Sequence, residues 1–135
     1  MKVDGQCHCG AIQFDAEIDL QRVVICHCTD CQTLSGTAYR TVAFTSEDGL
    51  NFRVGEPKVY VKTAQSGKPR AQGFCGECGT AIYATSIGDG PKTYGLRTGS
   101  INQRASLKPV RQVWRGSALD WVDDIASLPA SPGQP

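Results

Sequence analysis

Residues 26–31 are Cys26-His27-Cys28-Thr29-Asp30-Cys31, a stretch that contains three cysteines. Disulfides between cysteines this close in sequence are strained, because the Cα separation and the torsion about the S–S bond must both be satisfied. A shared metal ion fits the spacing better, since three thiolates on one ion leave a fourth tetrahedral position for water or substrate. We therefore expect Cys26, Cys28 and Cys31 to hold a zinc ion in an open, catalytic type of site.

The remaining four cysteines form two close pairs. Cys75-Gly76-Glu77-Cys78-Gly79 is typical of a zinc knuckle, in which two thiolates bind one ion across a tight turn. A closed structural site needs four ligands, and Cys7 and Cys9 are the thiols left to complete it. The sequence thus predicts a structural zinc held by Cys7, Cys9, Cys75 and Cys78, and two zinc ions per chain.

Other uses of the cysteines stay open. A single structural zinc would leave the rest as buried thiols, and Cys75 and Cys78 have the spacing of a redox dithiol. Structural disulfides are a further alternative, but the count of seven cysteines is odd. His8 and His27 each stand between two cysteines, where an extended backbone would turn them away from the sulfurs. We expect both histidines to pack beside the metal sites rather than bind the metal.

Composition limits the class of protein. The chain has 135 residues, 40% of them hydrophobic, with 14 Lys and Arg against 13 Asp and Glu. This length predicts one domain, over residues 1–128, followed by a frayed Pro-rich tail at 129–135. The balanced charge argues against a nucleic-acid partner, and no apolar run is long enough for a membrane span. The first residues lack an apolar signal core, so we expect a cytoplasmic protein, in a compartment where disulfides are rare.

Hydrophobic alternation predicts a mainly β fold. At 11–18, Ile12, Phe14, Ala16 and Ile18 alternate with polar residues, which is typical of a half-buried strand. Further strands are expected at 22–26, 39–45, 51–54, 58–63, 70–74, 80–85, 92–98 and 108–114, with a turn at 46–49 and 51–54 paired to 58–63. Residues 29–34 predict a turn or a single helical turn, and 118–128 a short helix with Ser117 as its N-cap. The expected class is several small antiparallel sheets organised around zinc sites, with at most a short C-terminal helix.

Three cysteine motifs in this order, with shorter matches after them, carry a family resemblance. The matching residues are Gly5-Gln6-Cys7-His8-Cys9-Gly10-Ala11-Ile12-Gln13-Phe14, then 26–31 with Ser35-Gly36, Phe74-Cys75-Gly76-Glu77-Cys78-Gly79-Thr80, Gly99-Ser100-Ile101, Pro109 and Trp121. The chain resembles the glutathione-dependent formaldehyde-activating enzyme family, which also includes the centromere-protein-V-like proteins.

The resemblance implies a function and a division of the ligands. It implies a β-rich fold around zinc, with the same closed and open cysteine sets as the spacing predicts. The named reaction of the family joins glutathione to formaldehyde as S-hydroxymethylglutathione, and its members are carbon–sulfur lyases. We therefore expect an enzyme that acts on a small-molecule thiol and an aldehyde, with glutathione as co-substrate. Gln32 and Asn102 depart from the family, which often has a basic residue and an Asp at these positions.

Residues outside the metal motifs are expected to shape the substrate site. Ser35, Tyr39 and Arg40 follow the central cluster and are candidates for a pocket wall, while Arg97 and Arg104 could meet glutathione carboxylates. Two rival functions remain. The chain could be a non-catalytic zinc scaffold that binds a protein partner, which would need no open coordination position. It could instead be a carbon–sulfur lyase or thiol-transfer enzyme that acts on another thiol adduct.

Overall fold

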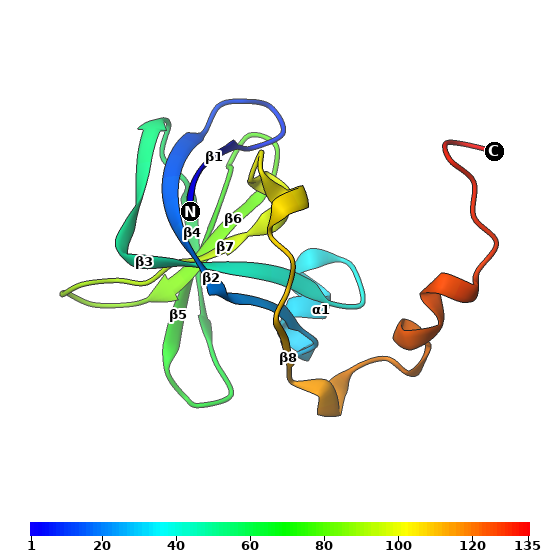
Figure 1. Cartoon of the computed structure of the whole chain (residues 1–135). Helices are drawn as coiled ribbons and strands as arrows, with labels where there is room; N and C mark the ends of the chain where they lie inside the picture. Colours follow the sequence, from blue (N-terminus) through cyan, green and yellow to red (C-terminus); the bar gives the residue numbers. More distant parts are fainter.

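Eight strands join in one curved sheet, which is antiparallel except where β8 runs parallel to β2 (Figure 1). The computed structural model describes residues 1–135. The strands are β1 Lys2–Gln6, β2 Gln13–Cys26, β3 Arg40–Val54, β4 Lys58–Thr63, β5 Pro69–Phe74, β6 Ala81–Ser86, β7 Gly95–Arg97 and β8 Arg111–Val113. The helical segments are α1 Thr29–Ser35 and the 3-10 turns η1 Thr98–Ser100, η2 Arg104–Ser106, η3 Arg115–Ser117 and η4 Asp120–Ser127.

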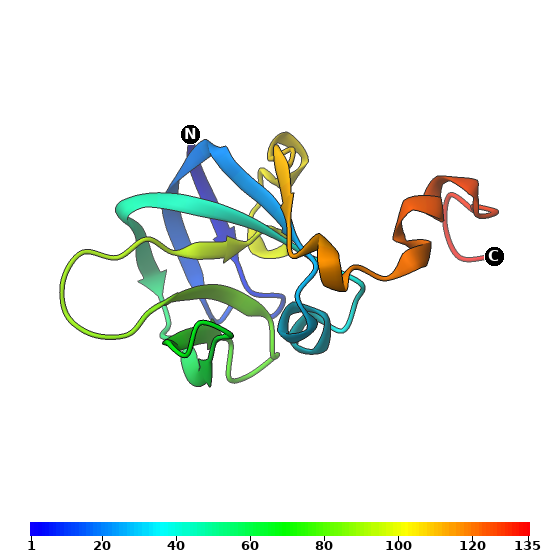
Figure 2. The ribbon, with the colours of Figure 1, turned by 90° about the horizontal axis from the view of Figure 1, so that it is seen from below.

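The order within the sheet is β1-β2-β3-β7-β6-β5-β4, with β8 beside β2. The predicted mainly β, antiparallel class is confirmed, as is the helical turn after Cys28. The strands form one sheet where several small ones were expected, because two strands of 14 and 15 residues each serve more than one neighbour. Along one edge, β2 pairs first with β1 and then, over its last residues, with β8. Figure 2 shows how these two long strands carry the chain across the molecule.

The break expected between strands at 11–18 and 22–26 is a bulge within β2. The pairing of β2 with β3 shifts register between Ile18 and Val23, and the strand continues on the other side. A bulge bends a strand without ending it, because the extra residues stay unpaired while the ladder resumes beyond them. The predicted alternation is confirmed at Ile12, Phe14, Ala16 and Ile18, which are all buried.

The turn expected at 46–49 was wrong, because β3 runs through it. Asp48, and not Gly49, takes a left-handed φ of 51°. The Asp48 amide donates to the Lys92 carbonyl at 2.7 Å, and the Lys92 amide donates to the Asp48 carboxylate at 3.0 Å. Residues 46–49 form a bulge in β3, and Asp48 makes its hydrogen bonds with Lys92 in the loop before β7. The chain therefore continues as a strand and does not reverse.

The pairing expected between 51–54 and 58–63 was also wrong, since β4 pairs with β5. Gly55 adopts a left-handed φ of 76° and turns the chain away from the end of β3. After β4, the Ala64 amide donates to the Lys68 carbonyl at 2.8 Å and closes a tight turn. That turn brings the chain back alongside β4. Residues 58–63 therefore pair with β5 and not with residues 51–54 of β3.

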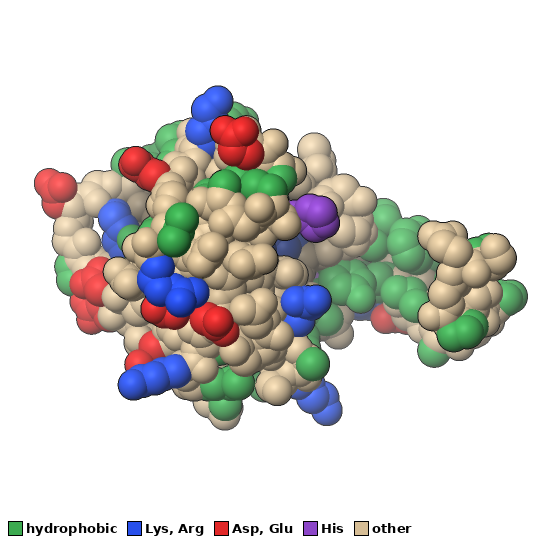
Figure 3. All heavy atoms as spheres, turned by 90° about the horizontal axis from the view of Figure 1, so that it is seen from above, with side chains coloured by type: hydrophobic (Ala, Val, Ile, Leu, Met, Phe, Trp, Pro, Cys, Tyr) green, Lys and Arg blue, Asp and Glu red, His purple; other side chains and the backbone are tan.

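The C-terminal helix is a 3-10 segment, η4, rather than an α-helix, and Ser117 is not its N-cap. Leu119 occupies the cap position and provides no side-chain hydrogen bond. The Ser117 hydroxyl instead donates to the His27 carbonyl at 2.9 Å. None of the residues of η4 is buried, and the segment projects away from the sheet (Figures 1 and 3).

The hydrophobic core includes two of the cysteines. Its 13 buried residues come mainly from β1, β2, β6 and the turns beside them. Cys7 and Cys75 are each 1% exposed and belong to this cluster, next to Phe14 and Ile82. No helix of the chain is long and apolar enough to cross a membrane.

A substitution at Gly5 tests the packing between β1 and the segment at 98–101. An added Cβ there would overlap the Ser100 carbonyl and the ring of Phe14. We expect Gly5→Ala to lower the free energy of unfolding by about 1–3 kcal/mol, as overpacking of a filled core does. Urea unfolding with zinc present measures this. Gly116→Ala is the control, since a Cβ there meets nothing within 4 Å, and equal stability of the two variants would contradict the packing.

Candidate metal centres

The first candidate metal centre joins two turns that are far apart in sequence. Cys7 and Cys9 lie between β1 and β2, while Cys75 and Cys78 lie between β5 and β6. Their sulfurs all lie within 4.8 Å of one another, with 3.6 Å from Cys7 to Cys9 and 3.9 Å from Cys9 to Cys75. Sulfurs bound to one tetrahedral zinc at ~2.3 Å stand about 3.8 Å apart. The structure therefore brings the predicted four together at a spacing that fits such an ion.

Backbone amides and one hydroxyl point at these sulfurs. The Ile12 amide donates to Cys7 Sγ at 3.2 Å, and the Glu77 amide to Cys75 Sγ at 3.4 Å. A hydrogen bond with the Thr80 hydroxyl is the largest cause that lowers the pKa of Cys78, to about 5. Donors around sulfur stabilise thiolate over thiol, which is the form that binds metals.

The second candidate centre is built where β2 ends and α1 begins. Cys26 is the last residue of β2, Cys28 is the N-cap of α1, and Cys31 lies in its first turn. The Cys28 sulfur accepts a hydrogen bond from the Cys31 amide at 3.2 Å, so the side chain that caps the helix also faces the cluster. The three sulfurs lie within 4.8 Å of one another. The predicted second set is thus also brought together, by local chain geometry alone.

Two thiols of this cluster, Cys26 and Cys31, affect each other's ionisation through a hydrogen bond. A hydrogen bond from Cys31 lowers the pKa of Cys26, and the same bond, together with burial, raises the pKa of Cys31. This hydrogen bond therefore favours ionisation of Cys26 over Cys31. A divalent cation would take the place of thiol protons, because metal binding and deprotonation of thiols are linked.

The donor sets fit zinc. All seven cysteines are free. Ligand sets made only of sulfur suit zinc, copper(I) or iron–sulfur clusters, whereas magnesium and calcium prefer oxygen. Cys7, Cys9, Cys75 and Cys78 would hold a closed ion, while Cys26, Cys28 and Cys31 would leave one position of a tetrahedron to another ligand.

Neither histidine joins a sulfur set, as the sequence predicted. His27 is 1% exposed, its Nε2 lies 2.7 Å from Gln112 Oε1, and its ring packs edge-on against Tyr39. His8 is exposed, and its amide donates to the Thr80 hydroxyl at 3.0 Å. Both residues support the cysteine loops without reaching the sulfurs.

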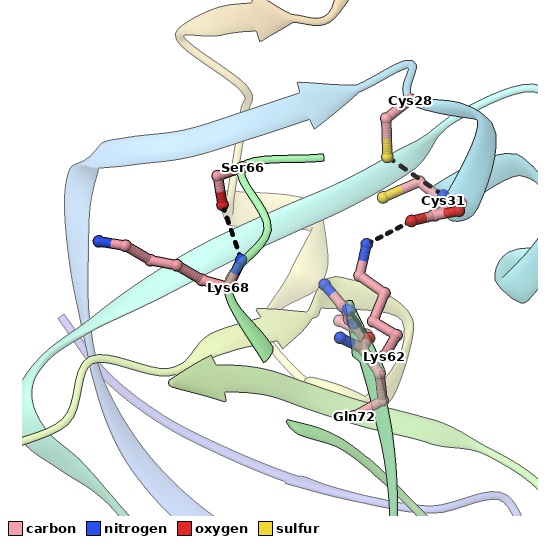
Figure 4. A network of polar contacts seen from close by, with 8 residues as sticks. Cys28, Cys31, Lys62, Ser66, Lys68 and Gln72 are labelled. Atoms are coloured by element: carbon pink, nitrogen blue, oxygen red, sulfur yellow. Dashed lines mark hydrogen bonds and ion pairs between the residues drawn. The ribbon is translucent and has the colours of Figure 1, made fainter. Parts of the chain in front are cut away.

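Two polar residues of the cluster have roles that sequence reasoning missed. Asp30 accepts a hydrogen bond from Lys62 Nζ at 2.8 Å, so that β4 is tied to α1 (Figure 4). Gln32, one of the departures from the family pattern, donates to the His27 carbonyl at 2.9 Å and to the Ser117 carbonyl at 3.0 Å. Lys62 and Ser117 lie far from Asp30 and Gln32 in sequence, so no local pattern indicates these two contacts.

The three sulfurs of the second centre line a pocket of about 260 Å³. Its wall carries four basic side chains, Arg40, Lys62, Arg70 and Arg97, and no Asp or Glu. Lys62 is paired with Asp30, as described above.

Most of the residues expected to shape a substrate site line pockets beside the second centre. Ser35, Tyr39 and Arg40 line an adjoining pocket of about 380 Å³. Arg97 lines both pockets. Arg104 does not, because it is exposed and its guanidinium donates to the Ile101 carbonyl at 3.1 Å.

Pairing across the sheet places the two arginines beside the cluster. Arg40 stands opposite Cys26 where β3 pairs with β2, and Arg97 stands opposite Val42 where β7 pairs with β3. Burial, and then repulsion from Arg40, lowers the pKa of Arg97 to about 9, which leaves it protonated at pH 7. The sequence marked both residues as candidates but could not show that they line the same pocket.

Comparison with known proteins agrees with the geometry. The family model for the glutathione-dependent formaldehyde-activating enzyme matches residues 2–117, a range that contains all seven cysteines and leaves η4 outside. A crystal structure of a Rhodobacter sphaeroides protein has a TM-score of 0.60 at 19% identity, covering 81% of this chain and 98% of that one, and so shares its fold. Comparison with curated proteins gave no match. Because the family model spans most of the chain, this protein belongs to the glutathione-dependent formaldehyde-activating enzyme family.

Proposed function

We propose that this chain is a zinc-dependent carbon–sulfur lyase that acts on a thiol–aldehyde adduct, as in glutathione plus formaldehyde giving S-hydroxymethylglutathione. Cys7, Cys9, Cys75 and Cys78 would hold a structural zinc, and Cys26, Cys28 and Cys31 a second, catalytic zinc. Residues 1–128 would form the functional unit, with 129–135 as a tail. A reducing, cytoplasmic setting would keep the thiols free.

One observation carries this proposal. The sulfurs of Cys26, Cys28 and Cys31 line an open pocket, and that pocket has basic and apolar walls. A purely structural ion would gain nothing from such a pocket, whereas a substrate thiol needs a route to the site and an environment that favours its ionised form. Zinc bound by three thiolates would supply a position at which a fourth thiol is held as thiolate at neutral pH.

The side chains around the pocket have separate tasks in this reaction. Formation of the adduct makes one carbon–sulfur bond and transfers the thiol proton to the carbonyl oxygen, and the reverse reaction breaks that bond. Arg40 and Arg97 provide a positive field that favours thiolate. Lys62, held by Asp30, places an ammonium proton in the same wall, where an oxygen that gains charge could accept it. Leu34 and Trp114 provide part of the apolar wall of the pocket.

The alternative is a non-catalytic zinc scaffold that binds a protein partner. The C-terminal segment favours it, because Trp121, Ile125 and Leu128 are exposed by 54%, 44% and 60%. A protruding segment with exposed apolar residues is typical of an interaction site. The two functions differ in one requirement, since only the enzyme needs an exchangeable ligand at the second metal.

The zinc content of the purified protein tests the two metal centres. We expect close to two zinc ions per chain by elemental analysis. Cys28→Ser should retain about one ion and its β-sheet circular dichroism, because only the second set loses a ligand. Cys9→Ser is the matched variant in the closed set, and it should lose thermal stability as well, since that set ties the core together. A single ion that survives Cys28→Ser would contradict the two-site arrangement.

A glutathione–formaldehyde assay tests the reaction itself. Exchange between free formaldehyde and S-hydroxymethylglutathione, followed by NMR, should be faster with the zinc-loaded protein than without it. Cys28→Ser should reduce this acceleration by about 100-fold or more, as loss of a metal-held nucleophile does. Free cysteine and 2-mercaptoethanol in place of glutathione separate the named reaction from one on another thiol. No acceleration with any thiol, at full zinc occupancy, would favour the scaffold.

A further inference from the structure

The C-terminal arm, residues 118–128, carries an apolar stripe that the rest of the chain leaves exposed. Most of the arm is η4, a 3-10 helix, in which residues three apart lie on the same face. Four large aliphatic residues follow this spacing through η4 and its two caps: Leu119, Val122, Ile125 and Leu128. None of them is buried, and Leu128 is 60% exposed. Figure 3 shows hydrophobic side chains gathered on the projecting arm, as is typical of an interaction site.

The arm is also acidic. All 14 Lys and Arg residues of the chain come before residue 116, whereas the segment after it contains Asp120, Asp123 and Asp124 and no basic side chain. Asp123 pairs with Arg115 at 3.0 Å, and the other two carboxylates take part in no ion pair. A surface that binds this arm therefore needs basic groups beside apolar ones.

The β4–β5 hairpin, residues 58–74, has this complementary character. β4 is the last strand in the order of the sheet, so one of its edges is unpaired. Val59, Tyr60 and Val61 are exposed by 52%, 55% and 52%. The hairpin contains no Asp or Glu, and its four basic residues are Lys58, Lys62, Lys68 and Arg70. Lysines along an edge discourage pairing with another strand, but they suit an acidic helical segment.

The arm and the hairpin of one chain are held apart. In Figures 1 and 2, η4 and the hairpin lie on opposite sides of α1. Ser117 fixes the root of the arm beside α1, because its carbonyl accepts a hydrogen bond from Gln32 at 3.0 Å and its hydroxyl donates to the His27 carbonyl at 2.9 Å. The ion pair between Arg115 and Asp123 ties η4 to that root. A second copy can bring its hairpin to the arm without breaking these contacts.

We propose that the arm of one copy docks on the β4–β5 hairpin of a second copy, so that two chains exchange arms in a symmetric dimer. The apolar stripe packs on residues 59–61, and the free carboxylates of the arm face the lysines of the hairpin. At ~2.0 Å per residue the eight residues of η4 span about 16 Å, and at ~3.4 Å per residue the six of β4 span about 20 Å. One arm therefore covers most of the exposed strand.

Twofold symmetry gives this contact twice in each dimer, because each chain offers one arm and one hairpin. The exposed apolar residues of the arm are then covered by a second copy of the same chain. The dimer does not depend on the proposed reaction, since the arm and residues 58–61 and 68 lie outside the pocket of the three sulfurs.

Sedimentation equilibrium of the zinc-loaded full chain measures the association. We expect a monomer–dimer equilibrium in which Ile125→Asp raises the dissociation constant at least about tenfold, because a charge replaces an apolar anchor. Ala126→Asp is the matched control, since it adds the same charge to the next residue, on another face of η4. It should leave the dissociation constant unchanged. A chain that stays monomeric up to about 1 mM, or equal effects of the two variants, overturns the proposal.

Exchanged charges separate docking between chains from docking within one chain. The arm variant Asp120→Lys/Asp124→Lys and the hairpin variant Lys58→Glu/Lys68→Glu should each dimerise poorly alone, because like charges meet at both contacts. In an equimolar mixture, the reversed arm meets the reversed hairpin, and the original arm meets the original hairpin. We expect the mixture to regain dimers, with the zinc content and circular dichroism of each variant as checks of folding. Failure of the mixture to regain dimers, as when each arm folds on its own hairpin, refutes the exchange.

Discussion

The fold depends on four cysteine sulfurs that come from two turns distant in sequence and lie together at one site. Cys9 and Cys75 are 66 residues apart in sequence, yet their sulfurs lie 3.9 Å apart. Cys7 and Cys75 are also members of the hydrophobic core, so the sulfur cluster and the core are one continuous unit. A metal that binds these thiolates contributes folding energy directly, because the unfolded chain lacks the assembled site. The first hairpin and the β5–β6 turn thereby become one structure.

The second sulfur cluster is assembled by local chain geometry. Its three sulfurs come from six consecutive residues, and their convergence follows from the way a strand ends in a helical turn. The surroundings hold that turn in place. Gln32 and Ser117 bond to the His27 carbonyl, and Lys62 bonds to Asp30. A site held by ligands close in sequence can lose its metal without loss of the fold, which suits an exchangeable centre better than a structural one.

Electrostatics distinguish the pocket from the rest of the surface. On the face seen in Figure 3, basic and acidic side chains are interspersed, as the near-neutral net charge predicts. The wall around Cys26, Cys28 and Cys31 is instead basic, and its arginines form no ion pair. Charge of one sign in a pocket favours anionic ligands and thiolates, since a concave site concentrates the electrostatic field.

Hydrophobic alternation and turn-forming residues predicted the elements that depend on sequence neighbours, and misplaced those that depend on other pairing partners. The alternation from Ile12 to Ile18 and the turn after Cys28 depend on neighbours in sequence, and both are found as expected. The bulge at Asp48 depends on Lys92, which is distant in sequence, so no local pattern shows it. The pairing of β4 with β5 is local, but it competes with the equally local pairing expected between 51–54 and 58–63. Ser117 was assigned a cap because nothing local shows the His27 carbonyl that it binds.

The sequence by itself determined the mainly β class, the seven thiols and their division into sets of four and three. Cysteine spacing is a local property, and an ion's coordination number limits how the thiols can be shared. Only the tertiary structure decided which side chains face the open set. Arg40 and Arg97 reach Cys26 through pairings between β2, β3 and β7, and a one-residue slip in either register would turn them to the other face of the sheet. Such registers result from the packing of the whole sheet, which no short stretch of sequence contains.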